Sequence, residues 1–336
     1  MNVEPFSLPL ADPVDTARGT VSERRGFLVT VERDGETGVG EATPLPGWTE
    51  SREACRSALE RAAATDARDE ALAACEGAPA ARHGVSLAFA DAAARARERP
   101  LYRQLGADGR VERVPVNATV GDADPATTAA RVRGVLDDGF RTAKLKVGAR
   151  SLADDIARLD AVRAAAPDAA LRVDANGAWD VGTARRALDA VGDVEYVEQP
   201  LAAPSLDEHA ALRDRGRIAL DESVAAAGVD EVVATDAADV VVLKPMALGG
   251  VDRTVDAGRR ARAAGVEPVV TTAFDAVYAR TAAVHAAAVL APLPACGLAT
   301  GDALARDLAA DPAPVADGAI AVPQGKGNGV AGPHVE

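Results

Sequence analysis

The chain has 336 residues, 48% of them hydrophobic, which is enough for a sizeable core and more than one domain. Its formal net charge of −14 disfavours nucleic acid and anionic membranes as partners. No apolar run approaches the roughly 20 residues of a membrane span. Residues 1–5 show no basic region followed by an apolar one, and the three cysteines lack metal-ligand spacing. We therefore expect a cytoplasmic protein, and the sequence leaves its oligomeric state open.

Acidic residues are spread along the whole chain, a pattern typical of adaptation to high salt. Of the 37 basic residues only four are lysines, namely Lys144, Lys146, Lys244 and Lys326. Lysine can give up its proton inside a protein, whereas arginine cannot. Lysines kept where arginine would serve as a charge indicate proton transfer. The alternative is that a GC-rich genome favours arginine and that the surviving lysines are accidental.

Residues 1–110 are predicted to form an α+β capping domain, because strands are followed by helices without alternation. A short apolar strand at 6–10, a loop at 11–22 and a hairpin of 25–32 with 37–42 come first. An Ala- and Arg-rich helical region follows at 50–104. Trp48 lies between them in a proline-rich loop, and it either packs under the hairpin or forms a pocket wall.

From residue 111 to about 314 the pattern changes to alternating strands and helices, which predicts an α/β fold, a (β/α)7β TIM-like barrel. The expected strands are 114–120, 142–147, 170–175, 194–198, 217–221, 239–244, 266–272 and 295–299. The expected helices are 125–139, 151–166, 180–192, 205–215, 228–237, 249–264 and 275–290. Residues 302–336 lack this alternation, and we expect residues from about 315 to 336 to return and complete the capping domain, with one strand at 319–322.

Three consecutive barrel strands end in carboxylates, Asp174, Glu198 and Asp221, spaced by about one βα unit. Parallel strands of a barrel present their C-terminal ends on one face, which is the catalytic face. Converging carboxylates suit a hard divalent ion, so we predict a Mg²⁺ site that Mn²⁺ could also fill. The alternative is a structural charge network with Arg172 or the lysines.

Lysines are expected at the same face. Lys144 and Lys146 are two residues apart on one strand and so point to the same side, with Lys146 nearer the end. A second ammonium and a nearby metal favour neutral Lys146, which makes it a usable base. Lys244 arrives four strands later and could face the other side of a bound substrate. A metal with a lysine base indicates removal of the proton α to a carboxylate of a small-molecule substrate.

These motifs resemble the enolase superfamily, and within it the muconate-lactonising subgroup. The K-x-K at 144–146, the three carboxylates and Lys244 carry the resemblance, together with G-V-G-E-A-T-P-L-P-G-W at 38–48. The chain is most similar to the o-succinylbenzoate synthase family of the menaquinone pathway. The segments that carry this similarity are R-V-D-A-N-G-A-W (172–179), A-L-D-E-S (219–223), V-V-L-K-P-M-A-L-G-G (241–250) and C-G-L-A-T (296–300).

The resemblance implies a Mg²⁺-dependent dehydration of 2-succinyl-6-hydroxy-2,4-cyclohexadiene-1-carboxylate. It also implies roles for individual residues. Lys146 would remove the α proton and return it to the leaving hydroxyl, while Lys244 would steady the enediolate from the other face. Lys144 would tune Lys146, and Asn176 would support the site.

Two other readings remain open at this stage. An N-acylamino acid racemase or a dipeptide epimerase uses the same scaffold and also needs two lysines. The end of strand eight reads G-L-A-T-G-D (297–302) and lacks the Asp-x-Asp of dipeptide epimerases. Strand seven ends without histidine, which disfavours histidine-based racemisation. A non-catalytic metal- or ligand-binding barrel is the third reading, and the complete lysine–carboxylate set argues against it.

Overall fold

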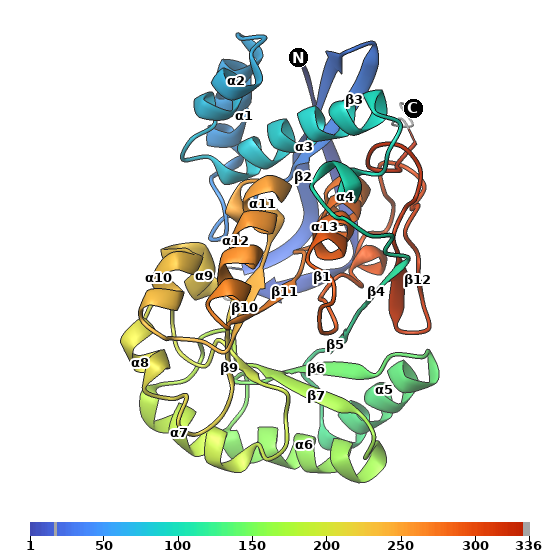
Figure 1. Cartoon of the computed structure of the whole chain (residues 1–336). Coiled ribbons are helices and arrows are strands. Elements are labelled where there is room, and N and C mark those ends of the chain that lie inside the picture. Colours follow the sequence, from blue (N-terminus) through green and yellow to red (C-terminus); the bar gives the residue numbers. More distant parts are fainter. Residues whose placement is uncertain (17–18, 332–336) are drawn as a thin grey trace.

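The computed structural model describes residues 1–16 and 19–331. An antiparallel sheet and a group of helices come first in the chain (Figure 1). The elements of this N-terminal part are β1 (Asn2–Thr16), β2 (Gly19–Arg33), β3 (Glu36–Ala42), α1 (Arg52–Ala63), α2 (Arg68–Ala74), α3 (Pro79–Ala96) and α4 (Leu101–Gln104). The sheet order is β1-β2-β3.

Helix α3 packs directly on this sheet because β3 carries small residues. A Cβ atom on Gly40 would lie 1.9 Å from the carbonyl oxygen of Gly84, so only glycine allows this approach. A Cβ atom on Gly38 would likewise collide with the backbone of α3. The contact buries the alanines of α3 against Val29 and Val31 of β2.

The prediction of a loop at 11–22 was wrong for the described residues of this segment. Strands β1 and β2 remain paired there, with Val14 opposite Val21 and Thr16 opposite Gly19. Asp, Pro and Thr suggested a loop, but β-branched residues also suit a two-stranded ribbon. A register shift between Pro9 and Val14 accommodates the intervening proline. Residues 17–18 lie outside the described residues.

The second part is a curved parallel sheet covered by helices, with strand order β11-β10-β9-β8-β7-β6-β5. Its strands are β5 (Ala118–Val120), β6 (Thr142–Lys146), β7 (Ala170–Asp174), β8 (Val197–Glu198), β9 (Ile218–Leu220), β10 (Val240–Leu243) and β11 (Glu267–Val270). Its helices are α5 (Pro125–Asp137), α6 (Leu152–Ala165), α7 (Val181–Ala190), α8 (Leu206–Ala210), α9 (Glu222–Ala227), α10 (Val229–Ala234), α11 (Pro245–Leu248), α12 (Val251–Ala263) and α13 (Val277–Val289).

Isolated bridges close this sheet into the expected barrel. Cys296 bridges Val116, and Gly297 bridges Thr271 at the end of β11. The eighth strand expected at 295–299 is therefore reduced to single bridging residues. The strand expected at 114–120 is divided, because β4 (Arg113–Pro115) pairs with a later strand outside the barrel. The helix expected at 228–237 is α10 alone, since Gly228 adopts φ 85° and separates it from α9.

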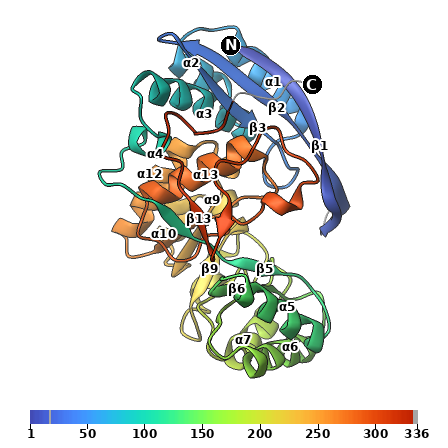
Figure 2. The same ribbon diagram turned by 90° about the vertical axis from the view of Figure 1, so that its right-hand side faces the viewer.

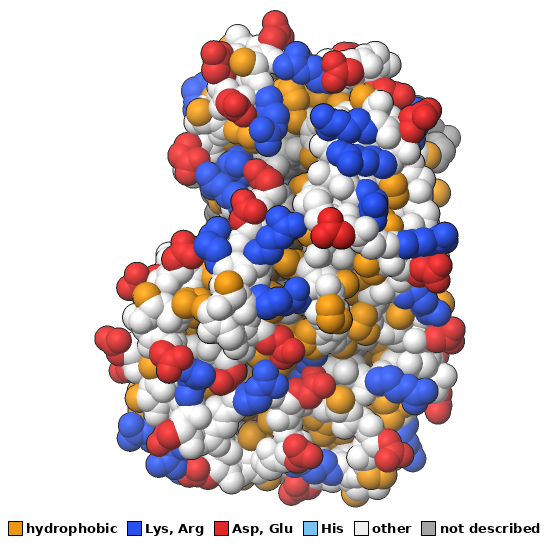
Figure 3. Space-filling model, viewed as in Figure 1, with side chains coloured by type: hydrophobic (Ala, Val, Ile, Leu, Met, Phe, Trp, Pro, Cys, Tyr) orange, Lys and Arg blue, Asp and Glu red, His pale blue; other side chains and the backbone are white. Residues whose placement is uncertain are grey.

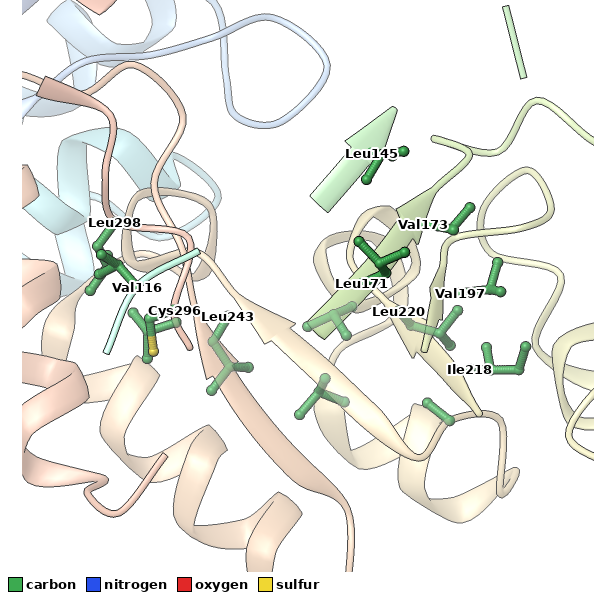
Figure 4. Close-up of a cluster of buried hydrophobic side chains, with 14 of the residues drawn as sticks. Val116, Leu145, Leu171, Val173, Val197, Ile218, Leu220, Leu243, Cys296 and Leu298 are labelled. Atoms are coloured by element: carbon green, nitrogen blue, oxygen red, sulfur yellow. The ribbon is translucent and has the colours of Figure 1, made fainter. Parts of the chain in front are cut away.

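Alternation along the strands sorts side chains into two sets. Leu145, Val173, Val197 and other apolar residues point outward and pack under the helices (Figure 4). The residues between them point into the barrel, where Tyr196, Ala219, Val240, Val242 and Val269 form a small inner cluster. The charged residues at the strand ends are an even number of positions away from this inner set, so their side chains point to the same side. The pattern therefore directs them to the axis of the barrel rather than to the helices.

The last residues return across the molecule to the helices of the N-terminal part (Figure 2). After a 3₁₀ turn (Gly301–Ala303), β12 (Val315–Ala316) and β13 (Ala319–Ala321) form a small sheet with β4 in the order β12-β13-β4. Gly327 then exchanges backbone hydrogen bonds with Arg99 and Leu101. The division into a capping domain and a barrel domain stays a prediction. No helix among the described residues is long and apolar enough to cross a membrane.

Candidate active site

The lysines and carboxylates predicted from the strand ends lie together at the C-terminal edge of the barrel sheet. Strand register places Lys146 opposite Asp174, and Asp174 opposite Glu198. Lys144 Nζ lies 2.9 Å from Asp174 Oδ2 and 2.8 Å from Glu198 Oε1. Lys146 Nζ lies 2.6 Å from the same Asp174 oxygen. The two lysines of the K-x-K motif thus share one carboxylate.

Lys244 reaches the other end of this row. It follows β10, and its Nζ lies 2.5 Å from Asp221 Oδ2. Because β7, β8 and β9 lie between β6 and β10, the three carboxylates separate Lys146 from Lys244. This arrangement leaves two amines on opposite sides of a shared acidic centre.

Asn176 joins the site through a tight turn after β7, where its φ is 45°. Its Oδ1 accepts from Lys146 Nζ at 2.7 Å, and its Nδ2 donates to Glu222 Oε1 at 3.0 Å. The sequence analysis did not single out Glu222. The other carboxylate oxygen of Glu222 is buried without a hydrogen-bond partner. The only signal for it was its place directly after Asp221.

Gln199 is a second site residue that the sequence analysis missed. It is fully buried and follows Glu198 with φ 41°. Its Oε1 accepts from the backbone N–H groups of Asp221 and Ser223, both at 3.1 Å. Gln199 therefore fixes the turn after β9 relative to the end of β8, which keeps Asp221 beside Glu198. Its polar side chain within E-Q-P was the only indication in the sequence.

Burial and neighbouring charges set the protonation of this cluster. Burial raises the pKa of Glu198 to about 7, and the charge of Asp174 adds to the rise. Burial also raises the pKa of Asp221. Burial acts the same way on Asp174, but Lys144 and Lys146 outweigh it and hold the pKa of Asp174 well below its usual range. For Lys144 burial works against the charge, yet Asp174 and Glu198 raise its pKa well above the ordinary value.

The donor set at this centre consists of oxygens and fits a hard divalent cation. Asp221 Oδ1 is buried without a hydrogen-bond partner, so one carboxylate oxygen of the cluster is available to a cation. As the side chains lie, no three His, Cys, Asp or Glu side chains of the described residues are grouped closely enough to hold a metal. Lys144 instead bridges Asp174 and Glu198, and Lys244 holds Asp221. A bound cation would therefore compete with ammonium groups for these oxygens.

Residues of the N-terminal part form one wall of the site. The Trp48 ring lies over Lys244, with Nζ 3.2 Å from the ring centroid. A narrow pocket there is lined by apolar and charged side chains, namely Arg24, Thr43, Leu45, Trp48, Thr49, Lys244, Met246, Ala247, Ala273 and Asp275. The pocket-wall interpretation of Trp48 therefore agrees with the geometry, and packing under the hairpin does not describe it.

Arg24 and Asp275 were not expected at this wall. Arg24 is buried and donates to the carbonyl oxygens of Thr43 at 2.8 Å and Phe274 at 3.2 Å. It thereby connects the loop that carries Trp48 to the segment after β11. Asp275 has one buried oxygen without a partner, and burial raises its pKa to about 6.

Comparisons with known proteins agree with this architecture. Residues 127–332 match the family described as enolase C-terminal domain-like, and residues 2–92 match the MenC N-terminal domain. The o-succinylbenzoate synthase of Mycobacterium tuberculosis is 46% identical over 224 residues, which cover 63% of this chain and 65% of that protein. The match therefore spans just under two thirds of the length of the curated relatives.

Solved structures show the same fold over nearly the whole chain. The L-Ala-D/L-Glu epimerase from Bacillus subtilis has a TM-score of 0.90 at 28% identity, covering 99% of this chain and 98% of that one. The N-succinyl Arg/Lys racemase from Bacillus cereus has a TM-score of 0.89 at 25% identity, covering 98% and 94%. From the match over residues 127–332, we conclude that this chain belongs to the enolase superfamily.

Proposed function

We propose that the protein is an o-succinylbenzoate synthase. It would remove water from 2-succinyl-6-hydroxy-2,4-cyclohexadiene-1-carboxylate and form the aromatic dicarboxylate. The observation that carries this proposal is the placement of Lys146 and Lys244 on opposite sides of three buried carboxylates. The 46% identity to a mycobacterial o-succinylbenzoate synthase and the match to the MenC N-terminal domain support this choice of substrate.

Asp174, Glu198 and Asp221 would hold a divalent metal, for which Mg²⁺ is the natural choice and Mn²⁺ a substitute. When bound, the metal supplies positive charge that stabilises a substrate carboxylate as negative charge builds up on it. Glu222 lies beside Asp221 with a free buried oxygen and adds negative charge to the same region. Removing the metal with EDTA should therefore abolish turnover.

Lys146 would act as the general base. Its Nζ is held between Asp174 and Asn176, at 2.6 and 2.7 Å, so the amine is fixed at the rim of the cluster. The side chain is 36% exposed, which leaves it accessible to a substrate in the site. Lys146 removes the proton next to the substrate carboxylate and returns it to the hydroxyl group that leaves as water. Formation of the aromatic ring favours this elimination.

Lys244 would act as a fixed positive charge. It lies between the Asp221 carboxylate and the face of Trp48, two groups that both attract a positive charge. On the far side of the carboxylates from Lys146, it would stabilise negative charge on the substrate as the proton leaves. Lys144, half-buried between Asp174 and Glu198, would hold these two carboxylates in place.

Racemisation of an N-acylamino acid is the second candidate. The observation in its favour is the similarity to the N-succinyl Arg/Lys racemase, at a TM-score of 0.89, together with a lysine on each side of the site. A racemase uses both lysines to move protons, whereas the synthase needs only one base. The synthase proposal is favoured by the higher identity to the mycobacterial relatives.

The two functions are separated by parallel assays on one preparation. The purified protein in molar KCl with Mg²⁺ receives the cyclohexadiene substrate, and ultraviolet absorbance follows the aromatic product. A second sample receives N-succinyl amino acids, and polarimetry follows loss of optical rotation. The proposal predicts rapid formation of the aromatic product that EDTA abolishes. No product from a folded, metal-loaded protein, combined with racemisation, would replace the synthase with the racemase.

A further inference from the structure

Two side chains of helix α6 hold the backbone at Lys146 and just after it. Arg158 Nη1 donates to the carbonyl oxygen of Lys146 at 2.9 Å. The N–H of Gly148 donates to Asp155 Oδ2 at 2.8 Å. Arg158 and Asp155 also pair with each other at 2.8 Å, and each is only 1% exposed. A buried ion pair within one helix is therefore hydrogen-bonded to the backbone of the segment 146–148.

Arg158 also forms hydrogen bonds with residues that follow the neighbouring strand, β5. Its Nη2 donates to the carbonyl oxygen of Gly121, just after β5, at 3.2 Å. Its Nε donates to Thr128 Oγ1 of α5, also at 3.2 Å. The planar guanidinium presents its N–H groups in a fixed fork, so these bonds fix the end of β6 relative to the end of β5.

The segment that they hold is a bend that follows β6. Gly148 adopts φ 87°, and a Cβ atom there would lie 2.7 Å from the Cβ atom of Ala178. Glycine meets this steric demand, but it also allows many other backbone conformations. The bond from Gly148 to Asp155 therefore restricts a position that would otherwise be the most adaptable one near Lys146.

A buried ion pair is weak evidence for a purely stabilising role, because desolvation of both ions offsets much of their attraction. Apolar side chains could fill the same space, but they could not direct a carbonyl and an N–H group. We propose that Asp155 and Arg158 are positioning residues that set the place of the Lys146 amine relative to the substrate α carbon. This inference rests on the proposed role of Lys146 as the base.

Substitutions of the pair test the inference. Asp155→Ala and Arg158→Met should each lower kcat by about 10- to 100-fold, because misplacing a catalytic group by about 1 Å can cost about 100-fold. KM should stay within about threefold, since neither residue lines the pocket beside Trp48. With substrate deuterated at the α carbon, the primary isotope effect on kcat should increase. Asp155→Asn keeps an acceptor for Gly148, so it should retain more activity and serves if Asp155→Ala does not fold.

A similar ion pair elsewhere provides the matched control. In α3, Arg95 Nε pairs with Asp91 Oδ2 at 2.9 Å, and the buried Asp91 accepts from the backbone N–H of Val39 and Asn328. Asp91→Ala and Arg95→Met should therefore cost stability in the same way, without touching Lys146. Their kcat per folded molecule and their isotope effects should match the wild type.

Hydrogen exchange gives a readout that does not depend on the reaction. Mass spectrometry of the peptide around residues 144–150 should show faster amide exchange at Gly148 in Asp155→Ala, while α6 stays protected. Unchanged exchange there would overturn the inference, and so would a kcat loss that only follows the folded fraction with an unchanged isotope effect. If the wild type fails to convert the cyclohexadiene substrate, the proposed function is wrong. The exchange result still decides whether Asp155 and Arg158 hold the backbone of residues 146–148 in place.

Discussion

Each of the three lysines placed by spacing at strand ends lies against a carboxylate of the site. Lys144 and Lys146 contact Asp174, and Lys244 contacts Asp221. Spacing was sufficient because parallel strands end at one edge of a sheet and because alternate residues point to one face. The fourth lysine, Lys326, pairs with Glu36 on the surface. The roles assigned to the site lysines stay proposals.

A substitution of Trp48 tests the wall of the pocket. Trp48→Ala removes the ring that covers Lys244 Nζ at 3.2 Å. Because the ring also lines the pocket, losing about 1.4 kcal/mol of apolar contact with the substrate would raise KM about tenfold, while Trp48→Phe should retain most of the affinity. Steady-state kinetics of the three proteins provide the check. A KM that stays within twofold in Trp48→Ala would exclude Trp48 from substrate binding.

Other site residues could not be read from the sequence. Glu222 and Gln199 act through hydrogen bonds that cross between loops, and such bonds depend on the exact path of each turn. Gln199 also adopts a positive φ of 41°, which its residue type does not indicate. Arg24 reaches the site from a strand far away in the chain. The contacts of Glu222 and Gln199 form only once the barrel loops have packed, and that of Arg24 only once the N-terminal sheet lies against the barrel.

At the scale of elements, the strands with clear alternation were predicted best. Strand β6 was expected at 142–147 and spans Thr142–Lys146, because its apolar and charged residues alternate. The eighth strand was overestimated, since only Cys296 and Gly297 form bridges. Its extent depends on closure of the barrel, which local sequence does not encode. The ribbon of β1 and β2 was underestimated because its polar composition resembles a loop.

Glu41 connects two elements and makes stability depend on pH. From β3, its carboxylate accepts from the backbone N–H groups of Ala276 and Ala279 at the start of α13, both at 2.9 Å. Burial raises its pKa from 4.5 to about 7, with a further rise from Asp275. The folded state therefore binds more protons than the unfolded state between these values. This contribution to stability is complete below about pH 4.5 and is lost as the pH rises through 7.

Glu41→Gln removes this titration. The free energy of unfolding of the variant, relative to that of the wild type, should increase by on the order of 3 kcal/mol as the pH rises from 4.5 to 8. One pKa unit corresponds to about 1.4 kcal/mol. Urea denaturation at several pH values measures the difference. Glu60→Gln, on an exposed part of α1, is the control and should follow the wild-type curve. Parallel curves for Glu41→Gln and the wild type would contradict the assignment.

Two features concern the molecule as a whole, namely the contacts between its two parts and its net charge. The N-terminal part is attached to the barrel by buried polar contacts such as that of Arg82 with Gly249 and Asp252. Acidic and basic side chains intermingle over the surface in Figure 3. The formal net charge is nevertheless −14, so the folded chain repels itself at low ionic strength.

Salt should therefore stabilise the protein. The Debye length falls from about 10 Å at 0.1 M to about 3 Å at 1 M, which screens this repulsion. Between 0.1 and 2 M KCl we expect Tm to rise by at least about 3 °C, equivalent to about 1 kcal/mol for a chain of this size. Circular dichroism during heating measures it. A constant or falling Tm would contradict salt adaptation of the fold.

The proposed reaction depends most on Lys146, the base that would remove the α proton. Lys146→Arg keeps the positive charge and its place beside Asp174, but arginine cannot give up its proton. Lys326→Arg is the matched control, because Lys326 forms only a surface ion pair with Glu36 at 2.7 Å. Both variants and the wild type are assayed in molar KCl in the presence of Mg²⁺. Their turnover is measured from the absorbance of the aromatic product.

The proposed role predicts that Lys146→Arg loses at least about 100-fold in kcat, which is the low end of what a general base contributes. Lys326→Arg should retain wild-type turnover. The folded state and metal binding of Lys146→Arg should be confirmed in the same preparation. Turnover by Lys146→Arg within about threefold of the wild type would contradict the assignment of Lys146 as the base.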